Sequence, residues 1–462
     1  MGQYNFIPIQ REQDLLLPPS LRDWLPEQDL AWFIIDAVSQ MNLKPFYARY
    51  RNDGWGNAAY DPEMMVSLLL YAYCLGVRSS REIERHCERD IAFRVITANQ
   101  RPDHTTIARF RQANEKELSA LFTEVLRLCT EAGLVNVGLV ALDGTKVKAN
   151  ASLGANRTYA WIEEKVQKML EEAAVKDEEE EQRYGSDKRG DELPEELQDR
   201  GKRLARLKEA KDRLEQEAEE AASIQAQKIK EREEEERESG KKKRGRKPKQ
   251  PDEKPQTESK ANMTDPQSRI MKTRTGYVQG YNAQAVVTEE QIIVAADVTQ
   301  AENDKQQLHP MLEQAQAELS EAGIKDKIGT ALQDAGYWSE NNILKADPEG
   351  PELLIATTKD WKQRKILREK DPPRGRIPKG LSTMERMERK LRTKRGWALY
   401  AKHSSSKRRG YIVEPIFGQI KDIRGCDRFM RRGHVAVQSE WRLIAATHNL
   451  LKLWRSGKWT WT

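Results

Sequence analysis

Apolar residues recur at helical spacing through the first 135 residues. Three stretches carry this pattern: LRDWLPEQDLAWFIIDAVSQM, DPEMMVSLLLYAYCLGV and SSREIERHCERDIAFRVITA. Cap-type residues stand at the starts of the second and third, Asp61-Pro62 and Ser79-Ser80. In the next stretch, RPDHTTIARFRQANEKELSALFTEVLRLCTEAG, either Asp103 or Thr105 is placed to cap a helix that a longer amphipathic helix follows. We therefore predict a helical domain over residues 1–135.

The pattern changes at Val137, where an apolar run leads into Asp143 and then Gly144. We predict one or two strands over Val137–Ala151, with Asp143 at the end of the apolar strand. Later, YNAQAVVTEEQIIVAADVT predicts two strands around a Glu-Glu turn. Helix 304–323, strand 327–337, helix 339–347 and strand 352–357 follow, an alternation that predicts a mixed α/β sheet. Residues 357–405 are basic and interrupted by Pro and Gly, and the chain then ends in helical patterns.

Residues 159–261 separate the first predicted strand from the others. This segment is rich in Lys and Glu and has few sustained apolar heptad positions, which favours a solvated helical hairpin or partial coiled coil. Its last part, residues 240–260, has the composition of a flexible basic linker. Because a strand precedes the segment, we interpret it as a charged helical insert in one α/β domain, which comprises residues 136–158 and 262–462.

The composition indicates in which compartment the protein resides and what kind of partner it binds. The four cysteines form no CxxC pair and no zinc spacing, and neither a signal peptide nor a membrane-length apolar run is evident, so we expect a reduced, cytoplasmic protein. The net charge is only +6, but acidic residues concentrate in the middle of the chain and basic residues around 241–249 and 402–432. Such basic patches favour a polyanionic partner over a membrane.

Three acids stand where catalytic carboxylates are common. Asp143 and Asp334 each end an apolar strand, and Glu414 in YIVEPIFGQIK opens a predicted helix. Taken singly, the two aspartates are more typical of turns and Glu414 of a helix start. Together, oxygen ligands on strand ends and a facing helix suit Mg²⁺ or Mn²⁺. Two such ions, about 4 Å apart, activate a nucleophile and stabilise the leaving oxygen in phosphoryl transfer.

Motifs along almost the whole chain resemble the DDE transposases of bacterial insertion sequences, most closely the insertion sequence 1182 group among relatives of the insertion sequence 4 and 5 types. These motifs are YDPEMMVSLLLYAYCLGVRSSREIER, PDHTTIARFR, ALDGTKVKANAS, TDPQSRIM, GYVQGYNAQAVV, DAGYW, VEPIFGQIK and EWRLIAATHNLLKL. The resemblance implies an RNase H-like catalytic domain behind a helical domain for DNA binding or dimerisation. It also implies a function in binding terminal inverted repeats, hydrolysing phosphodiesters and joining strands, in an assembly that is at least a homodimer.

The resemblance also assigns roles to individual residues. Asp143, Asp334 and Glu414 match the three acids, and Lys421 matches the lysine of the family's Tyr-Arg-Glu-Lys signature. The signature's Tyr and Arg positions hold Lys407 and Gly410, with Arg408 and Arg409 as nearby substitutes. Helical spacing would place Glu414, Lys421 and Arg428 on one face of a helix.

Several residues are candidates for contact with DNA. Arg244 and Arg246 in KKKRGRKPK resemble an AT-hook, although a solvated basic linker has the same composition. Arg109 and Arg111 fit either a helix-turn-helix motif or an ordinary surface helix. Trp338 fits either a base-stacking residue, which the resemblance implies, or a core residue. The remaining candidates, for phosphate contact, are Lys146, Arg424, Arg428, Arg431 and Arg432.

Three functions remain open on the sequence alone. The first is a DNA transposase, the second an RNase H-like nuclease that cuts without strand transfer, and the third an inactive DNA-binding protein derived from a transposase. The presence of all three acids argues against the third, whereas the displaced Tyr and Arg positions favour it. No role is assigned to Asp265 in TDPQSRIM.

Overall fold

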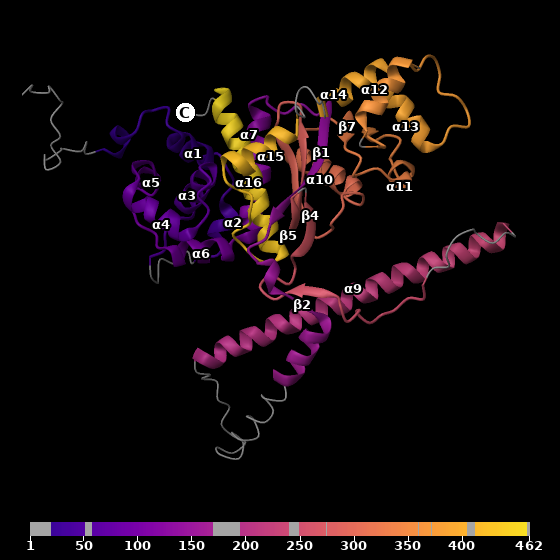
Figure 1. Cartoon of the computed structure of the whole chain (residues 1–462). Helices are drawn as coiled ribbons and strands as arrows, with labels where there is room; N and C mark the ends of the chain where they lie inside the picture. The colour runs from indigo at the N-terminus through magenta and orange to yellow at the C-terminus, as the bar shows by residue number, and fades with distance from the viewer. Residues whose placement is uncertain are drawn as a thin grey trace, which may run out of the picture. The chain divides into compact units, whose positions relative to one another are not determined.

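The computed structural model describes residues 20–50, 58–169, 195–239, 249–273, 275–358, 360–370, 372–403 and 412–459. The chain divides into two compact units, whose elements are labelled in Figure 1. The first unit joins the chain up to Leu134 with the chain from Leu443 onward, and the second runs from Val135 to Arg442. Among the described helices, none has both the length and the apolar character that a bilayer span requires.

The first unit is helical, as its sequence pattern predicts. Aspartate side chains cap four of its helices: Asp29, Asp61, Asp90 and Asp103 each accept a hydrogen bond from a backbone amide in the first turn. Asp103, not Thr105, is therefore the cap of the helix that carries Arg109. The helices are η1 (Leu21–Trp24), α1 (Leu30–Ser39), α2 (Lys44–Tyr47), α3 (Pro62–Cys74), α4 (Ser80–Arg89), α5 (Ile91–Ile96), α6 (His104–Ala113) and α7 (Glu115–Glu131).

The end of the chain joins this helical unit. Within α16 (His434–Ser456), the residues from Leu443 onward are mostly apolar and buried. The Cys74 thiol donates to the Thr447 carbonyl over 3.8 Å, and the Phe33 and Trp459 rings lie 5.2 Å apart. The assignment of residues 262–462 to the α/β domain stays a prediction; in the structure, the second compact unit runs to Arg442.

The second unit is built on a six-stranded mixed sheet, which confirms the predicted mixed α/β class. The sheet order is β4-β5-β1-β7-β8, and β6 also pairs with β5. β5 is antiparallel to β1, β4 and β6, whereas β7 and β8 continue parallel to β1. The strands are β1 (Leu139–Lys148), β4 (Arg269–Thr273), β5 (Gly276–Thr288), β6 (Ile293–Thr299), β7 (Thr330–Gln333) and β8 (Glu352–Ile355).

Helices connect and cover this sheet. α10 (Leu308–Glu321) connects β6 to β7, and α11 (Glu340–Leu344) connects β7 to β8. Between β8 and the third predicted acid lie α12 (Trp361–Lys370), α13 (Thr383–Arg392) and α14 (Lys394–His403), in the basic range that the sequence left unassigned. Trp441 of α16 is fully buried and donates from its indole nitrogen to the Gln284 carbonyl of β5 over 3.0 Å.

β1 does not end at Asp143, which corrects the sequence interpretation. Its pairing with β7 stops at Leu142, opposite Gln333, but its pairing with β5 continues to Lys148. Gly144 is therefore a paired strand residue and not a turn. Asp143 lies in mid-strand, at the point where one neighbouring strand has ended and the other continues.

The charged segment forms a helical subdomain with a small core of its own. Helical residues 159–169, the β2 (Asn156–Thr158) and β3 (Lys260–Asn262) pair and the long α9 (Glu195–Ser239) meet there. Its core consists of Ile162, Val166, Leu207, Ala210, Leu214 and Ala261. Arg213 of α9 donates to the carbonyls of Pro266 and Lys260, so α9 is bound to the segment that leads into β4.

Candidate active site

Asp143 lies on β1, and Asp334 directly follows the neighbouring strand β7. Because Leu142 and Gln333 are register partners in parallel strands, the residues that follow them occupy the same edge of the sheet. Burial, together with the negative charges of Asp334, Asp304 and Glu414, raises the pKa of Asp143 to about 8. One backbone amide, that of Gly144, donates to the Asp143 carboxylate over 2.8 Å and opposes this shift. The two predicted aspartates therefore lie near enough for the charge of Asp334 to act on Asp143.

Glu414 reaches the cluster from a short helix. It is the first residue of α15 (Glu414–Gly418), it is exposed, and its charge acts on Asp143. The π-helix η3 (Gln419–Ile423) follows directly and contains Lys421. The Lys421 ammonium donates to the Thr145 hydroxyl and, over 2.7 Å, to the Lys146 carbonyl. These bonds hold the helix of Glu414 against the strand of Asp143.

The predicted helical face from Glu414 to Arg428 does not form. The helical segment ends at Ile423, and the wider π-turn changes the phase of Lys421 relative to Glu414. Residues after it are extended and pair with the end of β1: the Lys148 amide donates to Asp427, and the Phe429 amide donates back to Lys148 over 2.8 Å. Arg428 is therefore placed beside Lys148 by strand pairing rather than by a helix.

A fourth acid, Asp304, was missed by the sequence analysis. It lies in the loop between β6 and α10, and its carboxylate accepts hydrogen bonds from the amides of Asn282 (2.6 Å) and Gln284 (2.8 Å). The Lys146 ammonium lies 3.7 Å from the same carboxylate. A usable signal was present, because Asn282 and Gln284 are polar residues spaced two apart in an otherwise apolar strand and so share one face.

The donor chemistry of this cluster fits a hard divalent cation. The charges of Asp304, Asp334 and Glu414 act on Asp143, and Lys146 is a nearby positive charge. Oxygen donors in negative excess are the ligands that Mg²⁺ and Mn²⁺ prefer. Among the described residues, however, no three His, Cys, Asp or Glu side chains converge as the ligands of one ion would. The acids are thus coupled by charge and are not assembled into a finished coordination sphere.

The predicted DNA residues occupy different environments. Arg109 is exposed on α6, whereas Arg111 is buried and donates to the Arg78 carbonyl (2.8 Å), the Tyr73 hydroxyl and Ser80. A DNA contact by Arg111 would require these bonds to break. Trp338 is half-buried beside the fully buried Tyr337.

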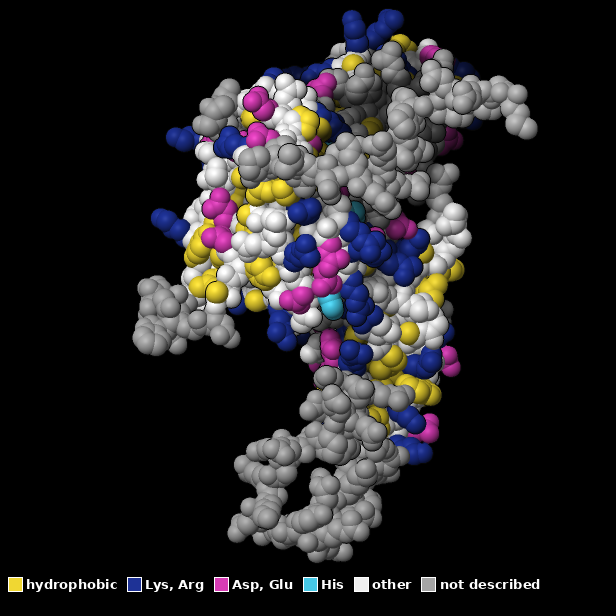
Figure 2. All heavy atoms as spheres, turned by 90° about the vertical axis from the view of Figure 1, so that its left-hand side faces the viewer, with side chains coloured by type: hydrophobic (Ala, Val, Ile, Leu, Met, Phe, Trp, Pro, Cys, Tyr) yellow, Lys and Arg dark blue, Asp and Glu magenta, His cyan; other side chains and the backbone are white. Residues whose placement is uncertain are grey.

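Of the four predicted DNA-contacting arginines after Glu414, three are at least partly exposed and one is buried. Arg424 is buried, Arg431 is half-buried, and Arg428 and Arg432 are exposed. Lys and Arg side chains gather in several groups on the face of the molecule drawn in Figure 2. Four further predicted DNA residues, Arg244, Arg246, Arg408 and Arg409, lie outside the described residues.

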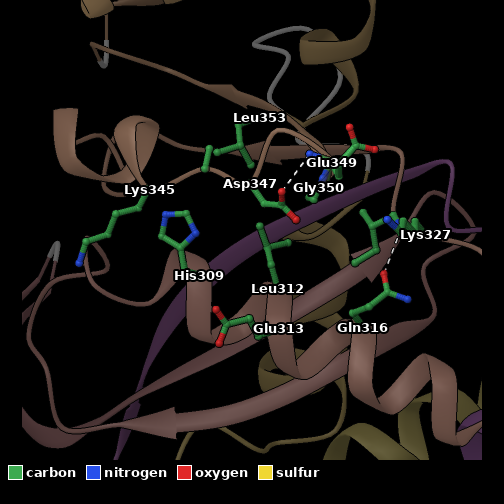
Figure 3. Close-up of a pocket in the computed structure, with 13 residues that line it drawn as sticks. His309, Leu312, Glu313, Gln316, Lys327, Lys345, Asp347, Glu349, Gly350 and Leu353 are labelled. Atoms are coloured by element: carbon green, nitrogen blue, oxygen red, sulfur yellow. Dashed lines mark hydrogen bonds between the residues drawn. The ribbon is translucent and has the colours of Figure 1, made fainter.

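A pocket in the same unit lies at the other end of the strands. Figure 3 shows its lining, with Leu312 and Gln316 on α10, Asp347 and Gly350 in the loop before β8, and Leu353 on β8. The lining also includes Ile328, which precedes β7. None of the four coupled acids lines this pocket. Because sites in open α/β sheets form at the carboxyl ends of strands, the acid cluster is the stronger candidate.

Two parts of the chain match family models. Residues 19–113 match the model described as a transposase domain (DUF772), and residues 250–450 match the transposase DDE domain. The second match begins in the segment before β3 and includes Asp304, Asp334 and Glu414 but not Asp143. Comparisons with curated proteins and with solved structures gave no significant match.

Proposed function

We propose that this chain, which carries a transposase domain and a transposase DDE domain, is a DNA transposase that acts on the terminal inverted repeats of its own element. It would cut the DNA at each end and join the released 3′-hydroxyl to target DNA. One observation carries this proposal: Asp143 lies on β1, Asp334 directly follows the adjacent parallel strand β7, and the charges of Asp334 and Glu414 both act on Asp143.

The strand order supports an RNase H-like catalytic unit. The central strand β1 carries the first acid and has the antiparallel β5 on one side and the parallel β7, which leads to the second acid, on the other. The third acid comes from α15, which Lys421 ties to β1. This arrangement agrees with the fold that the resemblance implies for the three acids.

Each group of residues at the site would have a distinct role. Asp143, Asp334 and Glu414 would hold Mg²⁺ or Mn²⁺, which when bound activates the attacking oxygen and stabilises the leaving oxygen of a phosphodiester. Lys421 would keep the helix of Glu414 in register with β1. Exposed Arg428 and Arg432 would contact phosphates, which gives affinity without sequence information. Two element ends must meet, so we expect at least a homodimer on DNA in the bacterial cytoplasm.

The test uses plasmid DNA that carries the inverted repeats flanking the gene. The wild-type chain should nick this DNA at the repeats in Mg²⁺ and yield joined donor–target product. Asp143→Ala, Asp334→Ala and Glu414→Ala should each lose at least about a thousandfold of cleavage rate, whereas Asp326→Ala, at an exposed acid before β7, should retain it.

The outcomes separate the three candidate functions. Cleavage that persists in any of the three acid variants would overturn the assigned triad. Cleavage without joined product would identify a nuclease, and repeat binding without cleavage in Mn²⁺ would identify an inactive DNA-binding protein.

A further inference from the structure

We propose that Asp304 is a fourth acid of this site, which supplies a carboxylate to a divalent cation held beside Asp334 and is neutralised by Lys146 until that cation binds. This inference rests on the proposed function, because it concerns the same acidic cluster. It adds to the three-acid assignment a fourth metal ligand, Asp304, and a lysine, Lys146, that balances the charge of Asp304 before the metal binds.

Glycines keep the space between these carboxylates open. A Cβ built on Gly336 would lie 2.8 Å from the Asp334 Oδ1 and 3.4 Å from the Asp304 Oδ2. The two carboxylates therefore approach the same point at the glycine, and a larger side chain there would meet both. On β1, a Cβ on Gly144 would lie 2.7 Å from the Asp304 Oδ1 and 3.0 Å from the Asn282 Oδ1. Only a residue without a side chain fits either position unless these groups shift.

A buried amide oxygen near Asp304 has no hydrogen-bond donor among the described residues. Asn282 is fully buried, and its Oδ1 finds no hydrogen-bond partner among the described residues. Its nitrogen is used, since it donates to Asp304 and to the Ala301 carbonyl over 3.2 Å. A buried acceptor without a donor is energetically unfavourable. An oxygen beside a carboxylate in that state is a ready ligand for a hard cation.

The Lys146 ammonium lies beside the carboxylate that the proposed cation would bind. This ammonium lies 3.7 Å from the Asp304 Oδ1, beyond hydrogen-bond distance, and finds no hydrogen-bond partner within the described part of the chain. Asp304, Asp143 and Glu302 all attract it. An ammonium held by charge alone is displaced by a competing cation, and its withdrawal would leave the Asp304 carboxylate available to that cation.

The network behind Asp304 fixes where that carboxylate lies. Gln284 donates to it, and the Tyr337 hydroxyl donates to the Gln284 oxygen. Tyr337 is fully buried, three residues beyond Asp334. These hydrogen bonds connect the loop of Asp304, through β5, to the segment that follows Asp334. Such a connection would hold the two carboxylates in place as ligands of one cation.

The experiment measures Mn²⁺ binding to the full chain without DNA, by calorimetry and by the electron paramagnetic resonance signal of free Mn²⁺. Asp304→Asn should weaken binding about tenfold or more. Glu302→Gln is the matched control, because it removes an exposed negative charge that also acts on Lys146. This control should change the affinity less than about twofold. Equal affinities for Asp304→Asn and Glu302→Gln would overturn the proposal.

Two more variants keep the test decisive. Lys146→Met should bind Mn²⁺ more tightly than wild type because the competing ammonium is gone, so an unchanged affinity would overturn the proposal even if Asp304→Asn failed to fold. Asp143→Asn tests the proposed function separately. If Asp143→Asn loses Mn²⁺ binding and Asp304→Asn does not, only the fourth acid fails. If neither loses it, the proposed active site fails as well.

Discussion

At the residue scale, Asp143 is a carboxyl group in a position that disfavours its own charge. It sits in a paired strand, where the charges of Asp304, Asp334 and Glu414 act on it, and within the described part of the chain its hydrogen-bond donor is the Gly144 backbone amide. An ionised carboxylate in this position lowers the free energy of unfolding, and a bound cation would offset that loss. The folded state of the metal-free protein is therefore destabilised at the point where its function is proposed to lie, as is common for functional sites.

We predict that Asp143→Asn stabilises the metal-free protein at neutral to basic pH. The folded-state pKa of Asp143 is about 8 against an ordinary 3.8, so between these values the folded state keeps a proton that the unfolded state has lost. Stability therefore falls as pH rises through that window, and asparagine removes this dependence. We expect a gain on the order of 1–3 kcal/mol at pH 8 and almost none at pH 4, measured by urea unfolding in a chelator. A loss of stability at pH 8 would contradict the assignment, with Asp326→Asn as the control.

At the element scale, the position of β1 depends on close backbone approach and on the segment after α15. Gly280 of β5 pairs with Lys148, and a Cβ at Gly280 would lie 2.4 Å from the Val147 carbonyl oxygen. The other side of this end of β1 pairs with residues 427–429. Small errors in this packing would shift Asp143 relative to both other acids.

We predict that Gly280→Ala destabilises the catalytic unit by about 1–3 kcal/mol, since the added methyl meets backbone that cannot rotate away. Gly154→Ala is the control, because its Cβ would meet the Ser152 hydroxyl at an ordinary 3.6 Å. Thermal and urea unfolding of the two variants provide the comparison, and equal stabilities would show that the strands separate at little cost.

The small core beside α9 makes a second prediction at this scale. Leu207 is 1% exposed in that core, whereas Ile224, further along the same helix, is 54% exposed. Leu207→Ala should weaken the helix by about 2–5 kcal/mol, seen as faster hydrogen exchange in residues 204–217. Ile224→Ala should change exchange by less than about 0.5 kcal/mol. Similar exchange in both variants would mean that α9 does not depend on this core.

At the scale of the whole molecule, the near-balanced net charge of +6 conceals local segregation. Lys148, Arg428 and Arg432 are exposed where β1 ends, five or more residues beyond Asp143, with Lys148 paired to Asp427 at 2.8 Å. A DNA strand whose phosphates contact the basic residues would present its backbone to the acids. Cations released from the DNA on binding would make that contact salt-dependent.

We predict that replacing Arg428 and Arg432 together by Ser lowers the slope of log binding constant against log salt by about 2, roughly 1 for each lost phosphate contact. The matched control replaces Lys325 and Lys327 by Ser, which removes the same charge at the start of β7, the end opposite Asp334. The control should leave the slope nearly unchanged. Equal slopes in the two double variants, measured by fluorescence anisotropy on repeat DNA, would exclude the arginines as contacts.

The sequence by itself determined the secondary structure types, the mixed α/β class and which acids to test. These follow from local properties: apolar periodicity sets helix or strand, aspartates such as Asp61 and Asp103 cap helices, and acids beside apolar strands stand out. The elements of residues 281–357 lie within a few residues of the predicted ranges for that reason. The three acids were named before their neighbours were known.

Only the tertiary structure decided where those elements pair and what surrounds each acid. The continuation of β1 past Asp143 depends on β5, more than a hundred residues later, and Arg111 is buried because distant backbone accepts its bonds. The residues around Asp304 resemble an ordinary helix start, and the signal that Asn282 and Gln284 carry lies on another strand, about twenty residues earlier. Its place beside Lys146 and Asn282 arises only when three separate segments meet. Burial, strand register and the interaction of charges all depend on contacts between segments that lie far apart in the chain. A single stretch of sequence therefore does not encode them.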